Sequence, residues 1–150
     1  MKIAVSSDHR GYQAKERIKK LLQESGHEVQ DFGTDGLSSC DYPDMAIVAA
    51  KAVAAGECDR GVLICGTGIG MSIAANKVHK VRAALCHDEL TAQLARKHND
   101  ANILCLPADL VGEQLIKLII HAWLTSEFEG GRHARRLDKI TEFENNGQCD

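Results

Sequence analysis

The 150-residue chain has few aromatic residues, only two prolines and no long uninterrupted apolar segment. Because aromatic residues make up only 4%, the chain lacks the stacking surfaces that hold single-stranded nucleic acid. The most apolar stretch, residues 115–124, is interrupted by Lys117 and His121, so no membrane-spanning helix is expected. A net charge of −3 without a basic run gives no sign of a nucleic-acid partner.

The sequence also shows no secretion signal and no paired metal-ligand motif. The N-terminal segment turns polar at Ser6, which is too early for the apolar part of a signal peptide. Without a Cys-x-x-Cys or a His-x-x-x-His pair, no structural zinc site is expected. We therefore expect a cytoplasmic protein whose six cysteines are reduced thiols, at Cys40, Cys58, Cys65, Cys86, Cys105 and Cys149.

Strand and helix patterns alternate along the whole chain, which has the size and composition of one globular domain over 1–150. Each of five short apolar runs leads into a segment with the apolar spacing of a helix. Short links between such units favour a parallel sheet covered on both faces. We predict an α/β fold, a Rossmann-like or flavodoxin-like three-layer sandwich around a five-stranded parallel sheet. The strands are expected at 3–5, 29–32, 61–65, 81–86 and 102–106.

The C-terminal segment is expected to leave this arrangement. Gly130 and Gly131 break the chain, and a last helix is predicted over about 132–145. Of all the predicted elements, it is the one best suited to dock elsewhere, including on a second subunit.

Polar residues follow the predicted strands at the edge where ligands bind in parallel sheets. The most informative segment is Gly66-Thr67-Gly68-Ile69-Gly70, whose glycines let backbone N–H groups approach an anion. It is neither a Walker loop nor a dinucleotide fingerprint, since no Gly-Lys-Ser/Thr follows and Met71 stands where the third glycine belongs. It suits a phosphate or a developing oxyanion, although a plain strand-to-helix turn would use the same residues.

The neighbouring side chains each allow two interpretations. Cys65 is a candidate base or nucleophile, or a small apolar residue that ends a buried strand. Asp8 and His9 form an acid/base pair, or a helix cap beside a surface histidine. His98 and Asn99 are polar candidates that also suit the end of a helix.

Arg132 and Arg136 lie four residues apart on one helical face. Two guanidinium groups on one face can clamp a phosphate. They can equally form a solvated basic face that Glu127 and Glu129 neutralise.

Taken together, six segments of the chain resemble the type B ribose-5-phosphate isomerases, a family that also holds the galactose-6-phosphate and allose-6-phosphate isomerases. The resemblance runs in order and spacing from residue 1 to about residue 144. The segments are Ser7-Asp8-His9, Asp41-Tyr42-Pro43, Ile64-Cys65-Gly66-Thr67-Gly68-Ile69-Gly70, Ile73-Ala74-Ala75-Asn76-Lys77, His98-Asn99-Asp100-Ala101-Asn102 and Gly130-Gly131-Arg132-His133.

The resemblance implies an aldose–ketose isomerase that moves a proton between carbons 1 and 2 of an open-chain sugar phosphate through an enediolate. It implies no metal and no redox cofactor. Some relatives carry a glutamate at the position of Met71 in place of the cysteine, so this chain resembles the cysteine type. The resemblance implies that Cys65 is the base and that Thr67 and the backbone of Gly66, Gly68 and Gly70 stabilise the enediolate oxygen. His98, assisted by Asp8, is implied to open the sugar ring. The phosphate is implied to bind to His9, Arg132 and Arg136, and the sugar to lie along Tyr42 and Asn99.

The resemblance further implies a homodimer or homotetramer whose sites are shared across the interface, with His98 and Asn99 facing Cys65 of a partner subunit. One position departs from the family: relatives usually have a phosphate-binding arginine after the fifth strand, and this chain has Asp109. Either Arg132 and Arg136 suffice, or Arg135 or Arg10 compensates, or the substrate differs.

Other functions stay open beside ribose 5-phosphate isomerisation. The Gly130–His133 segment argues against the galactose-6-phosphate branch, which leaves another aldose phosphate such as allose 6-phosphate. A non-catalytic sugar-phosphate sensor would use the same pocket, and a nucleotide-binding module is a third candidate. A phosphoacceptor receiver domain does not fit, because Cys65 and Leu106-Pro107 occupy the places of its aspartate and lysine.

Overall fold

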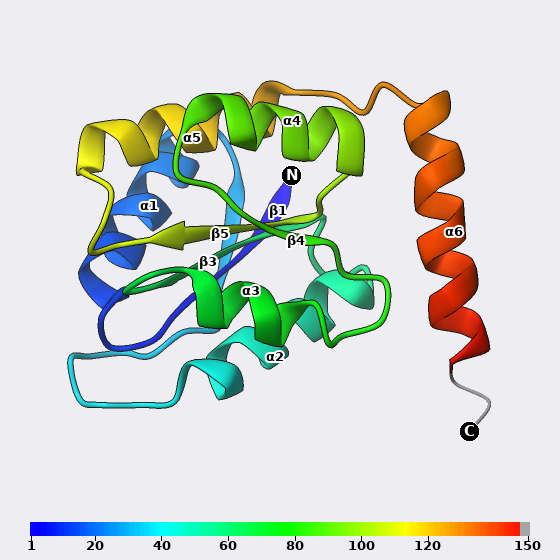
Figure 1. Cartoon of the computed structure of the whole chain (residues 1–150). Coiled ribbons are helices and arrows are strands. Elements are labelled where there is room, and N and C mark those ends of the chain that lie inside the picture. Colours follow the sequence, from blue (N-terminus) through cyan, green and yellow to red (C-terminus); the bar gives the residue numbers. More distant parts are fainter. Residues whose placement is uncertain (148–150) are drawn as a thin grey trace.

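The computed structural model describes residues 1–147. Its centre is a parallel sheet of five strands in the order β2-β1-β3-β5-β4. The strands are β1 (Lys2–Ser7), β2 (Glu28–Asp31), β3 (Arg60–Cys65), β4 (Ala83–Leu85) and β5 (Ile103–Pro107). Because all strands are parallel, their carboxyl ends form one edge of the sheet (Figure 1).

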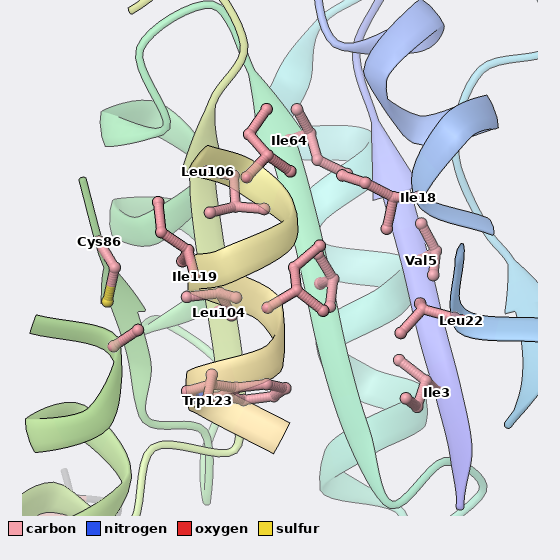
Figure 2. Packing of buried hydrophobic residues seen from close by; sticks show 14 of the residues in the cluster. Ile3, Val5, Ile18, Leu22, Ile64, Cys86, Leu104, Leu106, Ile119 and Trp123 are labelled. Atoms are coloured by element: carbon pink, nitrogen blue, oxygen red, sulfur yellow. The ribbon is translucent and has the colours of Figure 1, made fainter. Parts of the chain in front are cut away.

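Helices cover both faces of this sheet. They are α1 (Tyr12–Glu24), α2 (Tyr42–Ala54), α3 (Ile69–Ala75), α4 (Glu89–Asn99), α5 (Glu113–Thr125) and α6 (Arg132–Asn146). Apolar side chains of α1, α4 and α5 form one core with the sheet, and those of α2 and α3 form the other. Figure 2 shows the first core, in which Trp123 of α5 lies near Leu104 of β5, and Ile3 of β1 belongs to the same cluster. The predicted three-layer α/β sandwich is confirmed.

The order of the last two strands differs from the flavodoxin order, in which the fourth strand lies beside the third. Here β5 separates β3 from β4. The length and apolar content of the two strands give the physical reason, because β5 has five residues (ILCLP) and β4 only three (AAL). All five residues of β5 are buried, whereas the three residues of β4 are only partly buried. A strand that is apolar on both faces is best placed inside a parallel sheet, and the short β4 takes the edge.

A buried ion-pair cluster joins α1 to the end of β2. The Lys15 side chain is 1% exposed, and its ammonium donates to Asp31 and Glu16. Lys19 Nζ also contacts Asp31 Oδ2, at 2.7 Å. Burial by itself would raise the pKa of Asp31, but the hydrogen bonds from Lys15 and Lys19 outweigh it and lower this pKa. The cluster therefore depends on Asp31 being ionised.

Helix α6 stands apart from the sheet, beside the end of α4 (Figure 1). The predicted break at Gly130 and Gly131 is present, and both residues have positive φ. Within α6, His133 is the buried residue, while the apolar side chains of Ile140 and Phe143 are 51% and 78% exposed. The helix thus leaves most of its apolar surface uncovered by its own chain.

None of the helices in residues 1–147 is both long enough and apolar enough to cross a membrane.

Candidate active site

Cys65 ends the central strand β3 and lies beneath the glycine loop that follows it. The side chain is 5% exposed. The Gly68 backbone N–H donates to Cys65 Sγ at 3.1 Å. Gly68 adopts φ +72°, the left-handed region that glycine enters at least cost, and this turn directs its N–H at the sulfur. The loop therefore acts as a backbone donor to the thiol.

Tyr42 closes the other side of the same loop. It is the first residue of α2, and its ring lies so close to Gly70 that a Cβ there would fall 2.6 Å from a ring carbon. The Thr67 side chain is exposed, and Thr67 Oγ1 accepts from the Ile69 N–H at 3.4 Å. Tyr42, Thr67 and Cys65 thus surround the same glycine loop, as the sequence predicts.

Asp8 and His9 follow β1, which pairs with β3, so they lie at the same edge of the sheet. The Asp8 side chain is buried, and Asp8 Oδ1 accepts from the N–H groups of Arg10 at 3.0 Å and Gly11 at 2.9 Å. His9 Nδ1 lies 3.3 Å from the backbone N and O atoms of Cys40. One oxygen of Asp8 therefore shapes the turn, and the loop is held against the end of β3.

Asp109 also reaches this edge, from the turn after β5. The Asp109 N–H donates to the Gly66 carbonyl at 3.0 Å. The Asp109 carboxylate forms an ion pair with the Arg10 guanidinium. A bare carboxylate there would repel a phosphate, but the arginine neutralises it.

The remaining predicted residues lie at the opposite edge. Helix α4 ends at Asn99, and the chain then enters β5, whose first residue Ile103 pairs with Gly61 near the start of β3. Cys65 stands at the other end of β3, roughly 13 Å of strand away. His98, Asn99, Arg132 and Arg136 are therefore separated from Cys65 within one chain.

His98 is held by the start of α6, a relationship that the sequence did not predict. The rings of His98 and His133 stack with centroids 4.1 Å apart and planes 4° apart. Glu129 Oε2 lies 3.7 Å from His98 Nε2 and 3.9 Å from His133 Nε2. Burial lowers the pKa of His133, and the nearby positive groups act in the same direction. The one signal in the sequence is the histidine that follows Gly130-Gly131-Arg132.

The three side chains of His98, Glu129 and His133 also place their ligand atoms within 4.8 Å of one another, as a metal site would require. Arg132 Nε lies 3.4 Å from His133 Nε2 and competes for that nitrogen. The guanidinium charge opposes a second cation, so the cluster is better suited to hold His98 than to hold a metal.

Comparisons with known proteins identify the family of the chain. The family model described as ribose/galactose isomerase matches residues 3–140. Ribose-5-phosphate isomerase B of Escherichia coli (strain K12) is 49% identical over 143 residues, covering 95% of this chain and 96% of the relative.

Two solved structures are similar over nearly their whole length. Ribose-5-phosphate isomerase B of Clostridium thermocellum has a TM-score of 0.96 and 53% identity, covering 97% of this chain and 99% of that one. The Mycoplasma genitalium ribose-5-phosphate isomerase B, solved with bound ribulose-5-phosphate, has a TM-score of 0.92 and 43% identity, with 96% of each chain covered. From the Cys65 loop, the fold and these matches together, the chain belongs to the ribose/galactose isomerase family.

Proposed function

We propose that the chain interconverts ribose 5-phosphate and ribulose 5-phosphate. The observation that carries the proposal is the buried Cys65 thiol beneath the backbone N–H of Gly68, at the carboxyl edge of the sheet. The family and the names of its relatives supply the substrate class. In this proposal, the Cys65 thiolate takes the proton from carbon 2 of the open-chain sugar, the O2 hydroxyl proton passes to O1, and the Cys65 thiol returns its proton to carbon 1.

The glycine loop stabilises the intermediate of this transfer. Removing the proton beside a carbonyl places negative charge on the enediolate oxygen, and backbone N–H groups fixed at that point lower the barrier. Thr67 adds a hydroxyl at the same loop, and Tyr42 borders it from α2. The reaction consists of proton transfers, which require no metal or redox cofactor.

We propose that the complete site forms between two copies of the chain. His98, proposed to open the sugar ring with Asp8, lies at the edge of the sheet opposite Cys65, as do Asn99, Arg132 and Arg136. A second copy can bring its His98 edge to the first copy's Cys65. The exposed apolar residues Ile140 and Phe143 of α6 support a helix that is covered by a neighbouring subunit.

A cytoplasmic location belongs to the same proposal. Cys40, Cys58, Cys65, Cys86 and Cys105 are all unpaired within residues 1–147. Free thiols fit a reducing compartment.

The first experiment measures turnover of ribose 5-phosphate, with and without EDTA, beside allose 6-phosphate. We expect EDTA-insensitive conversion of ribose 5-phosphate and loss of deuterium from substrate labelled at carbon 2. Turnover of another aldose phosphate alone would change the substrate. Binding of the sugar phosphate without any exchange would make the chain a sensor and refute the isomerase proposal.

The second experiment tests the shared site. Inactive Cys65→Ala and His98→Ala chains are mixed under conditions where subunit exchange is confirmed. Activity should return in the mixture, because one of the two shared sites then holds both native residues. Cys58→Ala, at another buried cysteine, controls for loss of a thiol from the core. Absence of recovery would mean that both residues act within one chain.

A further inference from the structure

We propose that Arg10 binds the phosphate of the substrate in this chain, held in place by Asp109; the inference rests on the isomerase function proposed above. The Arg10–Asp109 ion pair joins the loop after β1 to the turn after β5. It lies over Gly66, the residue that follows Cys65.

The packing of the pair on Gly66 fixes its place. A Cβ on Gly66 would fall 2.6 Å from Asp109 Oδ2 and 2.8 Å from Arg10 Nε, so both side chains rest on the bare backbone of that glycine. The backbone of each partner is also tied down. The Arg10 N–H donates to Asp8 Oδ1 at 3.0 Å, and the Asp109 N–H donates to the Gly66 carbonyl at 3.0 Å.

The guanidinium keeps donors available for an anion. Its five N–H groups form a planar fork that can bind two oxyanions at once. Asp109 engages Nη2, and no other hydrogen bond or ion pair of the Arg10 guanidinium occurs within residues 1–147. The Arg10 side chain is 60% exposed, so the remaining donors face solvent at the Cys65 edge.

Stability does not explain the pair, since exposed ion pairs contribute little to folding. The location of the ion pair explains it instead. Arg132 and Arg136 lie at the far edge of the same chain, whereas Arg10 brings a positive charge next to Cys65. Without Arg10, the Asp109 carboxylate would stand at this edge and repel a phosphate. The pair therefore accounts for how the site accepts an acidic residue at position 109.

The test compares Arg10→Met with the double variant Arg10→Met/Asp109→Asn. If Arg10 binds the phosphate, Arg10→Met raises KM for ribose 5-phosphate by about tenfold or more, with kcat nearly unchanged. The double variant keeps a raised KM, because removing the carboxylate does not replace the lost donors. A double variant with the KM of the native protein would show that Arg10 only neutralises Asp109 and would overturn the proposal, as would an unchanged KM in Arg10→Met.

Binding of inorganic phosphate, followed by calorimetry, gives a readout that does not need turnover. It should weaken by a similar factor in Arg10→Met and in the double variant. Arg17→Gln is the matched control, because Arg17 is similarly exposed and forms its own ion pair with Glu113 on another surface. Arg10-dependent phosphate binding without any isomerisation would refute the proposed function alone. Turnover and phosphate binding that are indifferent to Arg10 would refute this inference alone.

Discussion

Replacing Gly68 by alanine should destabilise the protein through two separable effects. The first is backbone strain, because Gly68 has φ +72° and a residue with a Cβ enters this region at a cost of about 1–2 kcal/mol. The second is steric. The new Cβ would lie 2.5 Å from Leu85 Cδ1 and 3.1 Å from the Leu106 carbonyl carbon. The leucine side chain can move, but the β5 backbone is fixed in the middle of the sheet.

Relieving such overpacking typically costs about 1–3 kcal/mol, so Gly68→Ala should lose about 2–5 kcal/mol of unfolding free energy. Gly56→Ala provides the matched control. Gly56 has a similar φ of +76°, but no atom lies within 4 Å of its added Cβ. It should therefore lose only the backbone part, about 1–2 kcal/mol.

Trp123, the chain's one tryptophan, is fully buried and reports unfolding by its fluorescence. Urea titrations of the native protein and both variants, at one protein concentration, give the two free-energy losses. Isomerase assays on the folded variants should show a lower kcat in Gly68→Ala only, because its N–H contacts Cys65. Equal losses of stability in the two variants would refute the steric argument.

Three further predictions follow from single groups. Cys65→Ala should lower kcat by on the order of 10² or more without unfolding the protein, as expected when a positioned base is lost; turnover near the native rate would contradict its role. The pKa of Asp31 is lowered by Lys15, so the carboxylate stabilises the fold above its unfolded pKa of about 4, and this contribution is lost as the pH falls through the folded pKa. The difference in unfolding free energy between the native protein and Asp31→Asn should thus be constant from about pH 7 to 5 and shrink below about pH 4; a constant difference down to pH 3 would contradict the ion pair. Burial raises the pKa of Cys86 to about 11. At pH 8, iodoacetamide should therefore label the partly exposed Cys40 and leave Cys86 unmodified for far longer, as judged by mass spectrometry of peptides. Equal labelling rates would contradict the burial of Cys86.

Part of the candidate site could be predicted from local sequence, and part could not. The glycine loop beside Cys65 could be predicted because a short segment carries both the donors and the thiol. Tyr42, Asp8 and His9 could be placed with it because residues that follow parallel strands meet at one edge. The stack of His98 on His133 was missed, since β5 and α5 separate the helices α4 and α6 in the chain and a contact between them leaves no local pattern.

The ion pair of Asp109 is a second contact that local sequence could not predict. The resemblance to the family identifies Asp109 as a departure and offers Arg10 as one of several compensations. Arg10 meets Asp109 because the turns after β1 and β5 converge on Gly66. The two residues are far apart in the chain, and only the neighbours of β3 in the sheet bring them together.

The sequence by itself determined the alternation of strands and helices, the parallel sheet and the break before the last helix, because each follows from the local spacing of apolar residues and glycines. Tertiary structure decided the order of β4 and β5 and the pairing of Arg10 with Asp109. These features depend on which strand buries more apolar surface and therefore takes the inner position. That competition is settled only when all the elements pack together.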